Sequence, residues 1–507
     1  MGIETELKFE VAPQDLRKVK AAQPLHREPP TEEDLVSVYF DTPKHELARN
    51  AVSLRVRHIG DKRLQTIKSE GFGGIFRRGE WEHEINGDVP NLRRAHGTAL
   101  APLLTKKLQR TLKPIFETRV HRTVIPVAKN GSRIELALDE GRVSAGQQSA
   151  AISEIELELK QGKASEVFKL AREMAMLVPA KLELNSKAER GYDLIDDKPA
   201  QAVFAEAVKL QRGTSAADAF RIIARSTLRH ITGNETMVRK LDSEGVHQMR
   251  VGVRRLLAAI ALFCELLANE ETERIKSELK WLRDEIGSAR DLDVYEKSKV
   301  EPLRRAMLVK GMKEFESALA SRRADAFAKA KAAVESPRYR SLLLDTLQWI
   351  EIGEWARRSR RNGDRPIEQV AVDILARRTK KAAKKAKAQR ELNTGQRHKL
   401  RIAIKNLRYA SDFFKHLFVG QKAKKRLASF QACVEDLQDN LGILNDIAVH
   451  QKLAPQLAAE EAHTTSCARA FAAGVVSGIE QSEIEPLLNT VDKDVRKFAR
   501  IRPFWST

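Results

Sequence analysis

The chain has 507 residues, of which 42% are hydrophobic and 31% charged, a balance typical of folded domains and not of disordered chains. This length exceeds what one hydrophobic core supports and predicts about two to four domains. No apolar run is long enough to cross a bilayer, the first residues do not resemble a signal peptide, and three scattered cysteines fit neither a disulfide scaffold nor a zinc site. We therefore expect a cytoplasmic protein that does not bind membranes.

The net charge of +21 is distributed unevenly along the chain. Residues 1–200 hold 33 Lys and Arg against 30 Asp and Glu, whereas residues 201–507 hold 57 against 39. The C-terminal part therefore carries a surplus of 18 positive charges, which indicates a polyanionic partner such as nucleic acid, an acidic membrane surface or polyphosphate. A well-solvated helical surface accounts for such a surplus about equally well.

Up to about residue 200, apolar and polar side chains alternate with the period of two that is typical of half-buried strands. The clearest runs are Ile3–Phe9, Ser53–Arg57, Arg133–Asp139 and Glu154–Leu159. Turn-forming residues separate such runs, as at Lys129–Ser132. The pattern predicts a mainly antiparallel sheet with a few helices.

The charged positions of these predicted strands are segregated by sign. If the sheet closes with these faces inward, one lumen holds a carboxylate wall that suits Mg²⁺ or Mn²⁺ and a cationic wall that suits phosphates. The alternative is a one-sided sheet whose charges face solvent. The acidic strands contain Glu4 and Glu6, Glu135 and Asp139, and Glu154, Glu156 and Glu158, and the basic strands contain Arg55 and Arg57, Lys68, and Arg119 or Arg122.

Six sequence blocks in this half resemble, in order, those of the CYTH superfamily, the triphosphate tunnel metalloenzymes. The resemblance spans residues 1–195 and implies a closed antiparallel eight-stranded β tunnel with flanking helices, which we assign to residues 1–197. The blocks are Glu4-Thr5-Glu6-Leu7-Lys8, Tyr39–Pro43, Leu54–Arg57, Thr66–Lys68, Glu154–Glu156 and Ser186–Tyr192.

The resemblance also implies roles for individual residues of the lumen. The metal ligands would be Glu4, Glu6, Glu154 and Glu156, with Glu135, Asp139 and Glu158 as additional acidic groups. The phosphate ligands would be Lys8, Arg55, Arg57, Lys68, Arg122 and Lys187, with Arg122 favoured over Arg119 because the two lie on opposite strand faces. The catalytic set would be Glu4, Glu6, Lys8 and Lys68. The general base stays open between a carboxylate acting on metal-oriented water and a lysine such as Lys68.

Beyond about residue 205 the apolar period changes to 3.6, which predicts an all-helical domain. The boundary falls near Asp196–Ala200, a short polar segment with a proline. We therefore divide the chain into a first domain over residues 1–197, a linker over 198–214 and a helical domain over 215–507.

The helical part contains an internal repeat. His247–Leu256 is similar to His398–Tyr409, which begins 151 positions later, and Gly287–Val294 is similar to Gly442–Val449. On a helix, each copy places a basic arc beside an apolar stripe. A lone buried histidine is more often a core residue, but its recurrence with the same basic neighbours favours anion binding. The arcs are His247, Arg250 and Arg254 in one copy, and His398, Arg401 and Lys405, followed by Arg408, in the other.

Residues 215–505 resemble the CHAD domain, a helical domain of two repeats with histidines and basic residues. The resemblance implies two pseudo-repeated helical bundles that bind inorganic polyphosphate through the two basic arcs. The second copy departs from the first, because Lys405 stands in the place of Arg254 and Asn445 in that of Arg290. We therefore expect the two copies to contribute unequally.

The fusion of a CYTH-like region to a CHAD-like region resembles bacterial inorganic triphosphatases. This resemblance implies an enzyme that hydrolyses tripolyphosphate to pyrophosphate and phosphate, a helical domain that recruits longer polyphosphate, and an association with polyphosphate granules. The alternatives are a class IV-type adenylyl cyclase and a non-catalytic polyphosphate-binding scaffold. Nucleic acid is a weaker candidate partner, because no reader motif is present and only 6% of residues are aromatic.

Overall fold

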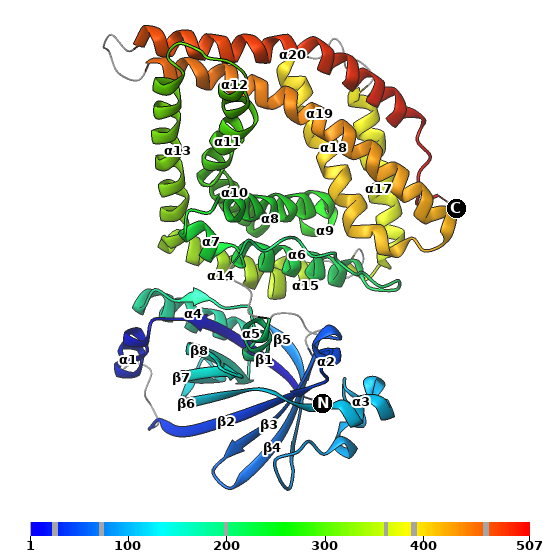
Figure 1. The fold of residues 1–507 in the computed structure, drawn as a ribbon. Coiled ribbons are helices and arrows are strands. Elements are labelled where there is room, and N and C mark those ends of the chain that lie inside the picture. The colour runs from blue at the N-terminus through cyan, green and yellow to red at the C-terminus, as the bar shows by residue number, and fades with distance from the viewer. Residues whose placement is uncertain are drawn as a thin grey trace. The chain divides into compact units, whose positions relative to one another are not determined.

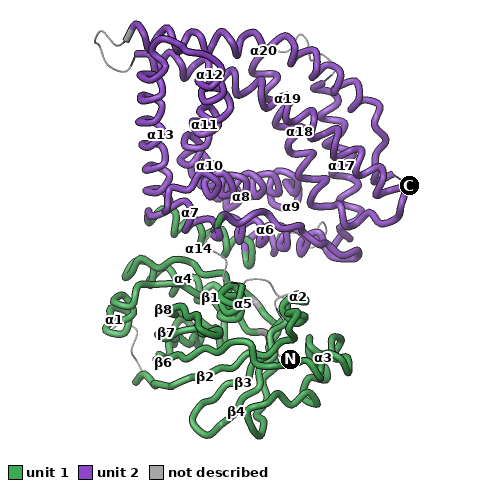
Figure 2. The backbone as a smooth tube through the Cα atoms, viewed as in Figure 1, with its two compact units in different colours: residues 1–201, 337–352 green, residues 202–336, 353–507 purple. Residues whose placement is uncertain are grey.

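The computed structural model describes residues 2–22, 29–69, 76–196, 201–358, 363–386, 393–459 and 466–506, so residues 197–200 of the expected domain boundary lie outside the described residues. The chain divides into two compact units (Figure 2). The first contains Met1–Gln201 and Pro337–Ile352, and the second contains Ala202–Ser336 and Gly353–Thr507. None of the described helices combines the length and the hydropathy that crossing a membrane requires.

The first unit is built on an antiparallel sheet that closes on itself (Figure 1). Its strands pair in the order β5-β4-β3-β2-β6-β7-β8-β1, β1 pairs with β5 to close the barrel, and β9 adds to β1. The predicted closed eight-stranded tunnel is therefore confirmed. The strands are β1 (Gly2–Glu10), β2 (Thr31–Asp41), β3 (Val52–Ile59), β4 (Lys62–Ser69), β5 (Arg77–Glu84), β6 (Lys113–Lys129), β7 (Ser132–Ala145), β8 (Gln148–Gln161) and β9 (Lys181–Leu182).

The longest hairpin, β6–β7, turns at the predicted turn residues. Lys129 pairs with Ser132, and the two residues between them, Asn130 and Gly131, have φ angles of 49° and 73°. Asn and Gly adopt positive φ more readily than other residues, and such two-residue turns match the twist of the flanking strands.

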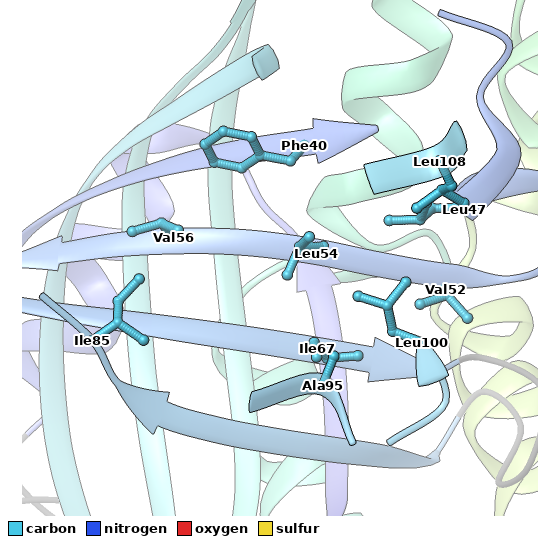
Figure 3. Close-up of a cluster of buried hydrophobic side chains, with 10 residues drawn as sticks. All are labelled: Phe40, Leu47, Val52, Leu54, Val56, Ile67, Ile85, Ala95, Leu100 and Leu108. Carbon is cyan, nitrogen blue, oxygen red and sulfur yellow. The ribbon is translucent and has the colours of Figure 1, made fainter. Parts of the chain in front are cut away.

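Packing outside the barrel decides which strand residues face inward. Leu54, Val56 and Ile67 belong to a buried apolar cluster on β2–β4 that Leu100 and Leu108 also join (Figure 3). Successive strand side chains point to opposite faces. The neighbouring positions 55, 57 and 68, which hold two arginines and a lysine, consequently face the interior.

Helices cover parts of the barrel, and one of them comes from a distant stretch of sequence. Helix α14 (Pro337–Ile352) belongs to the first unit, where it packs on α4 (Ala164–Leu177). Arg172 of α4 donates hydrogen bonds to Asp345 at 2.6 Å and Gln348 at 2.7 Å. The remaining helices of this unit are α1 (Pro13–Ala21), α2 (Glu46–Arg49), α3 (Lys106–Thr111) and α5 (Lys187–Ile195), with 3-10 turns at Leu92–Ala95 and Ala101–Leu103.

The described part of the second unit is helical, as the sequence predicts. The His247 segment of the repeat lies on α8 (Ser243–Leu262) and its counterpart from His398 on α18 (Thr394–Phe414), and the Gly442 segment lies on α19 (Gln421–Ala459). Both predicted apolar stripes are buried, with Met249 and Val253 in one and Leu400 and Ile404 in the other, all 0% exposed. The other helices are α6 (Ala216–Thr232), α7 (Glu235–Arg239), α9 (Cys264–Leu267), α10 (Glu270–Glu285), α11 (Gly287–Tyr295), a π-helical turn (Glu296–Val300), α12 (Glu301–Ala306), α13 (Met312–Glu335), α15 (Glu354–Arg358), α17 (Ile367–Ala386), a 3-10 turn (Lys415–Leu417) and α20 (Ser466–Arg500).

Candidate active site

The barrel encloses a cavity of about 420 Å³ whose wall is strongly charged. Each strand from β1 to β8 contributes to it, as does the start of α5. Among the residues expected at the site, Glu154 and Asp139 do not line the cavity. The expected residues that do are Glu4, Glu6, Lys8, Arg55, Arg57, Lys68, Arg122, Glu135, Glu156, Glu158 and Lys187.

Strand β1 places the Glu-x-Glu-x-Lys motif along one side of the cavity. Both carboxylate oxygens of Glu4 accept hydrogen bonds from Lys68 Nζ, at 2.8 and 2.7 Å. Lys68 also pairs with Glu80 at 3.1 Å, and Lys8 pairs with Glu156 at 3.7 Å. The motif is therefore part of a charge network that crosses the lumen.

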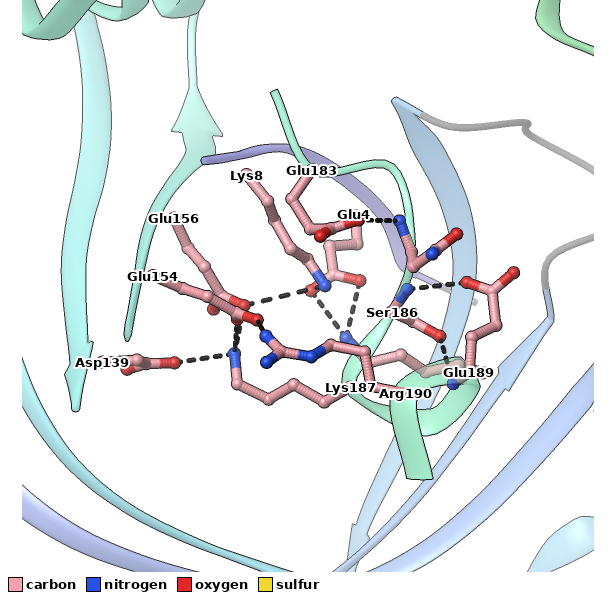
Figure 4. A network of polar contacts seen from close by, with 12 residues as sticks. Glu4, Lys8, Asp139, Glu154, Glu156, Glu183, Ser186, Lys187, Glu189 and Arg190 are labelled. Atoms are coloured by element: carbon pink, nitrogen blue, oxygen red, sulfur yellow. Dashed lines mark hydrogen bonds and ion pairs between the residues drawn. The ribbon is translucent and has the colours of Figure 1, made fainter. Parts of the chain in front are cut away.

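A buried carboxylate cluster lies beside the cavity and surrounds one ammonium group. Asp139, Glu154 and Glu156 each offer an oxygen, and these oxygens lie within 4.8 Å of one another. Lys187 Nζ contacts all three carboxylates, at 2.8, 2.7 and 2.6 Å respectively (Figure 4). This ammonium group already supplies the positive charge that a metal ion would otherwise bring to the three carboxylates.

Two arginines, together with Lys187, neutralise the negative charge of this carboxylate cluster. Arg122 donates two hydrogen bonds to Asp139, both at 2.7 Å, and a third to Glu156. Arg190 pairs with Glu154, which is 0% exposed. Arg119, in contrast, lies on the exposed surface of β6. The cluster is an ion-pair network, and Glu156 is the one of its three carboxylates that lines the cavity.

Helix α5 holds Lys187 in this position. Ser186 and Glu189 form a capping box, in which each side chain accepts a hydrogen bond from the other residue's backbone N–H. Further along the helix, Tyr192 donates a hydrogen bond from its hydroxyl to Asp41 at 2.8 Å. A Cβ atom at Gly191 would lie 2.3 Å from the Phe116 ring, so the helix approaches β6 closely.

The two glutamates of the motif have opposite electrostatic environments. Burial by itself raises the pKa of Glu4, but the charge and hydrogen bond of Lys68 outweigh it and lower the pKa to about 2. Burial followed by repulsion from Glu156 raises the pKa of Glu6 to about 8. No ion pair to Glu6 is found within the described residues. Glu6 is thus a buried lumen carboxylate whose ionised form is not stabilised by an ion pair.

The cationic wall also contains a group without a carboxylate partner. Arg57 donates a hydrogen bond to Ser37 Oγ at 3.1 Å, and no ion pair to it is found in the described part of the chain. Burial, together with the charges of Arg55 and Arg122, lowers the pKa of Arg57 to about 10. The pKa of Lys68 is raised, because Glu4 and Glu80 outweigh the effect of burial.

The cavity wall fits a hard divalent cation. Glu4, Glu6 and Glu156 supply carboxylate oxygens, which Mg²⁺ and Mn²⁺ prefer. The uncompensated charge of Glu6 is the specific feature that a cation would neutralise. Sequence reasoning missed Glu80 and Glu82, which also line the cavity. The alternation of glutamates at positions 80, 82 and 84 was the signal that could have found them.

A second charged cavity, of about 380 Å³, lies in the helical unit between the two copies of the repeat. Arg250 is held by Asp291, at 2.9 Å, and by the Gly287 carbonyl, and His398 is exposed beside Asn445 at 2.9 Å; neither lines this cavity. The expected anion ligands that do line it are His247 and Arg254 of α8 and Arg401, Lys405 and Arg408 of α18.

The charges in this second cavity repel one another. Burial, followed by the charge of Arg290, lowers the pKa of His247 to about 4. Burial, followed by the charges of Arg254 and Arg401, lowers the pKa of Lys405 from 10.5 to about 6. A bound anion would bring the negative charge that relieves this repulsion.

Comparison with known proteins matches the two parts of the chain to two different domain families. The CYTH domain family model matches residues 2–192, and the CHAD domain family model matches residues 222–455. An inorganic triphosphatase of Haemophilus influenzae is 33% identical over 161 residues, which cover 31% of this chain and 45% of that protein, so the chain spans less than half of this relative.

Two further similarities extend over more of the chain. An uncharacterized protein of Mycobacterium tuberculosis is 26% identical over 505 residues, covering 92% of this chain and 91% of that protein. The crystal structure of the CHAD domain from the plant Ricinus communis matches with a TM-score of 0.51 and 28% identity, covering 58% of this chain and 96% of that structure.

Proposed function

Because the chain carries a CYTH domain followed by a CHAD domain, we propose that it hydrolyses inorganic triphosphate to pyrophosphate and phosphate in the barrel and binds longer polyphosphate in its helical unit. The observation that carries the first half is the barrel cavity, whose wall combines carboxylates with arginines and lysines. The similarity to an inorganic triphosphatase over part of the CYTH domain supports the same substrate class.

The cationic wall would bind and orient the triphosphate. Arg57 has no carboxylate partner among the described residues, so its guanidinium is available for a phosphate oxygen without breaking an ion pair. Among the described residues, the ion pairs of Arg55 and Lys8 are long, at 4.0 and 3.7 Å. The raised pKa of Lys68 keeps its amine charged, which suits a phosphate ligand better than a general base.

The carboxylate wall would hold Mg²⁺ or Mn²⁺ through Glu4, Glu6 and Glu156. When bound, such an ion neutralises phosphate charge and makes a bound water more acidic. In the hydrolysis a water oxygen bonds to a terminal phosphorus, the bond from that phosphorus to the bridging oxygen breaks, and pyrophosphate leaves. We assign to Lys8 and Lys68, which line the cavity, the role of stabilising charge on the leaving oxygens.

Glu154, which we expected among the metal ligands, is better assigned to positioning. Its contacts with Lys187 and Arg190 fix the start of α5, and hence the Lys187 amine beside the cavity. In the helical unit, we propose that Arg254, Arg401, Lys405, Arg408 and His247 bind polyphosphate within the shared cavity.

Phosphate release from tripolyphosphate, ATP, thiamine triphosphate and long polyphosphate, each with Mg²⁺ or Mn²⁺, tests the proposal. We expect tripolyphosphate to be the preferred substrate, and the double variant Glu4→Gln, Glu6→Gln to lose about 100-fold or more in kcat. Glu117→Gln is the matched control, since Glu117 lies on the barrel's outside and pairs with Arg119. Turnover confined to nucleotides, cyclic AMP formation from ATP, or no turnover with either metal would contradict it.

A further inference from the structure

The cavity of the helical unit is made by both copies of the repeat. His247 and Arg254 reach it from α8, Arg401, Lys405 and Arg408 from α18, and α19 closes it with Asp439 and Asp446. Of these cations, Arg408 has a carboxylate at 3.9 Å, on Glu435. No ion pair to Arg254, Arg401 or Lys405 is found within the described residues.

The two copies differ in how their cations are compensated. In the first copy, Arg250 is paired with Asp291 at 2.9 Å and Arg290 with Asp293 at 3.0 Å. Asp293 is 0% exposed and also holds Arg323 at 2.9 Å. In the second copy, the positions of Arg290 and Asp293 hold Asn445 and Ala448, so no equivalent acidic centre exists there.

The amine of Lys405 is therefore enclosed by positive charge. Neither Asp439 nor Asp446 forms an ion pair with it, and burial acts in the same direction as the neighbouring cations. Both effects disfavour the ammonium form, which agrees with the lowering of its pKa to about 6. The charged and titratable groups around it are His247, Arg250 and Arg254 of α8, Arg283 of α10, Arg401, Arg408 and Tyr409 of α18, and Asp439 and Asp446 of α19.

We infer that Lys405 takes up a proton from solvent when a polyphosphate chain enters this cavity. The inference rests on the proposed polyphosphate binding and adds a proton to it: the neutral amine and one proton become an ammonium ion next to the phosphates. Negative charge brought by the chain reverses the electrostatic penalty on that ammonium. At the matching position of the first copy, Arg254 is an arginine and stays charged near neutral pH.

Binding is then linked to pH in a defined direction. Above a pH of about 6 the free cavity lacks this proton, whereas the complex holds it. Affinity for polyphosphate consequently falls as the pH rises above that value, as long as the complex keeps Lys405 charged. Lys405→Arg carries a permanent charge and removes this part of the pH dependence.

Calorimetric titration with inorganic polyphosphate of one chain length tests the inference. The full chain with Glu4→Gln and Glu6→Gln is used, so that the barrel does not hydrolyse the ligand. Binding enthalpies in two buffers of different ionisation enthalpy, at about pH 7.5, give the number of protons taken up. We expect the chain with Lys405 to take up about one proton more per cavity than the Lys405→Arg chain. Protons that the phosphates themselves gain or lose cancel in this difference.

Two further variants keep the outcome unambiguous. Lys399→Arg on the same helix is the matched control, because Lys399 is exposed and does not line the cavity, and it should take up as many protons as the parent. Lys405→Gln should take up no such proton and bind more weakly, and it carries the test if Lys405→Arg does not fold. Equal proton uptake with and without Lys405, at intact affinity, overturns the inference alone. No binding by the parent overturns the proposed polyphosphate binding and the proton linkage together.

Discussion

Glu6 and Arg57 are two buried lumen residues with no ion pair among the described residues. Repulsion from Glu156 and Glu4 disfavours the charge of Glu6, and repulsion from Arg55 and Arg122 disfavours that of Arg57. Lys68 pairs with Glu4 and Lys187 pairs with Glu156 instead. A metal ion at Glu6 and a phosphate at Arg57 would relieve both.

The first prediction concerns the stability of the metal-free protein at Glu6. Its pKa is about 8 in the folded state and near 4.5 in an unfolded chain, so between these values the folded state holds the extra proton. Stability therefore falls as the pH rises through this window. In EDTA, Glu6→Gln should raise the Tm of the barrel by about 2 to 8 °C at pH 8 and by little at pH 5.

A bound metal ion should reverse the order of the two Tm values. At pH 8, Mg²⁺ or Mn²⁺ should raise the Tm of the parent chain more than that of the Glu6→Gln chain, because the ion binds the ionised carboxylate. Glu117→Gln, on the outer surface, should respond to metal as the parent does. A Tm difference between parent and Glu6→Gln that stays constant from about pH 5 to 8 in EDTA would contradict this assignment.

At this scale, strand alternation predicts the face on which a residue lies but not its partners. Glu154 and Glu156 share a face of β8, and the resemblance to the CYTH superfamily implies that both are metal ligands. The structure places Glu154 behind the cavity wall, in contact with Lys187 and Arg190. Those contacts depend on where α5 packs against the barrel, and the sequence of β8 contains no information about that.

At the scale of elements, α14 shows that hydrophobic periodicity predicts a helix but not the element on which the helix packs. Its buried positions, such as Leu343 and Leu347, indicate an amphipathic helix, but a buried stripe does not name its partner. The helix lies within the helical half of the sequence, yet it packs on α4, and Arg172 reaches Asp345 across 173 positions. The barrel's closure, in contrast, was implied by the resemblance to the CYTH superfamily, whereas alternation alone also allowed a one-sided sheet.

The second prediction follows from that packing. A chain of residues 1–201 lacks α14, so the α4 face that the helix covers becomes exposed. We expect its Tm to lie about 4 to 8 °C below that of the same chain joined by a flexible linker to residues 337–352, which corresponds to about 2 kcal/mol. Thermal unfolding followed by circular dichroism measures the difference.

A double substitution distinguishes the effect of α14 packing on the Tm from the effect of the added linker. Asp345→Ala with Gln348→Ala in the joined chain removes both hydrogen-bond acceptors of Arg172 and should give an intermediate Tm. If the short and joined chains melt together, α14 does not stabilise the barrel. Activity comparisons between the full chain and residues 1–201 need the joined chain as reference.

At the scale of the whole molecule, the two units differ in how their positive charges are balanced. Residues 201–507 hold the surplus of 18 positive charges, and their cavity contains cations without acidic partners among the described residues. In the barrel, acidic and basic lumen residues largely compensate one another. This distribution suggests that the helical unit binds long polyanions while the barrel binds a short one with a metal.

The last prediction is that the two tasks can be removed one at a time. Arg254→Gln with Arg401→Gln should weaken polyphosphate binding and lower the slope of log affinity against log salt by about 2, one for each cation removed. Turnover of tripolyphosphate should stay within about twofold of the parent, because neither residue lies in the barrel. Glu4→Gln with Glu6→Gln should lower the turnover of tripolyphosphate and leave polyphosphate binding and its salt dependence unchanged. Lys399→Gln, which removes an exposed charge outside the cavity, should change binding little.

Chain length then distinguishes substrate delivery from simple attachment. If the helical unit delivers substrate, the arginine variant loses kcat/KM in proportion to chain length and keeps it for tripolyphosphate, since only a chain long enough to engage both units gains effective concentration. If the unit only attaches the enzyme to polyphosphate, kcat/KM in solution is unchanged at every length. Equal loss for tripolyphosphate and long chains fits neither role and would mean that the two units do not act independently.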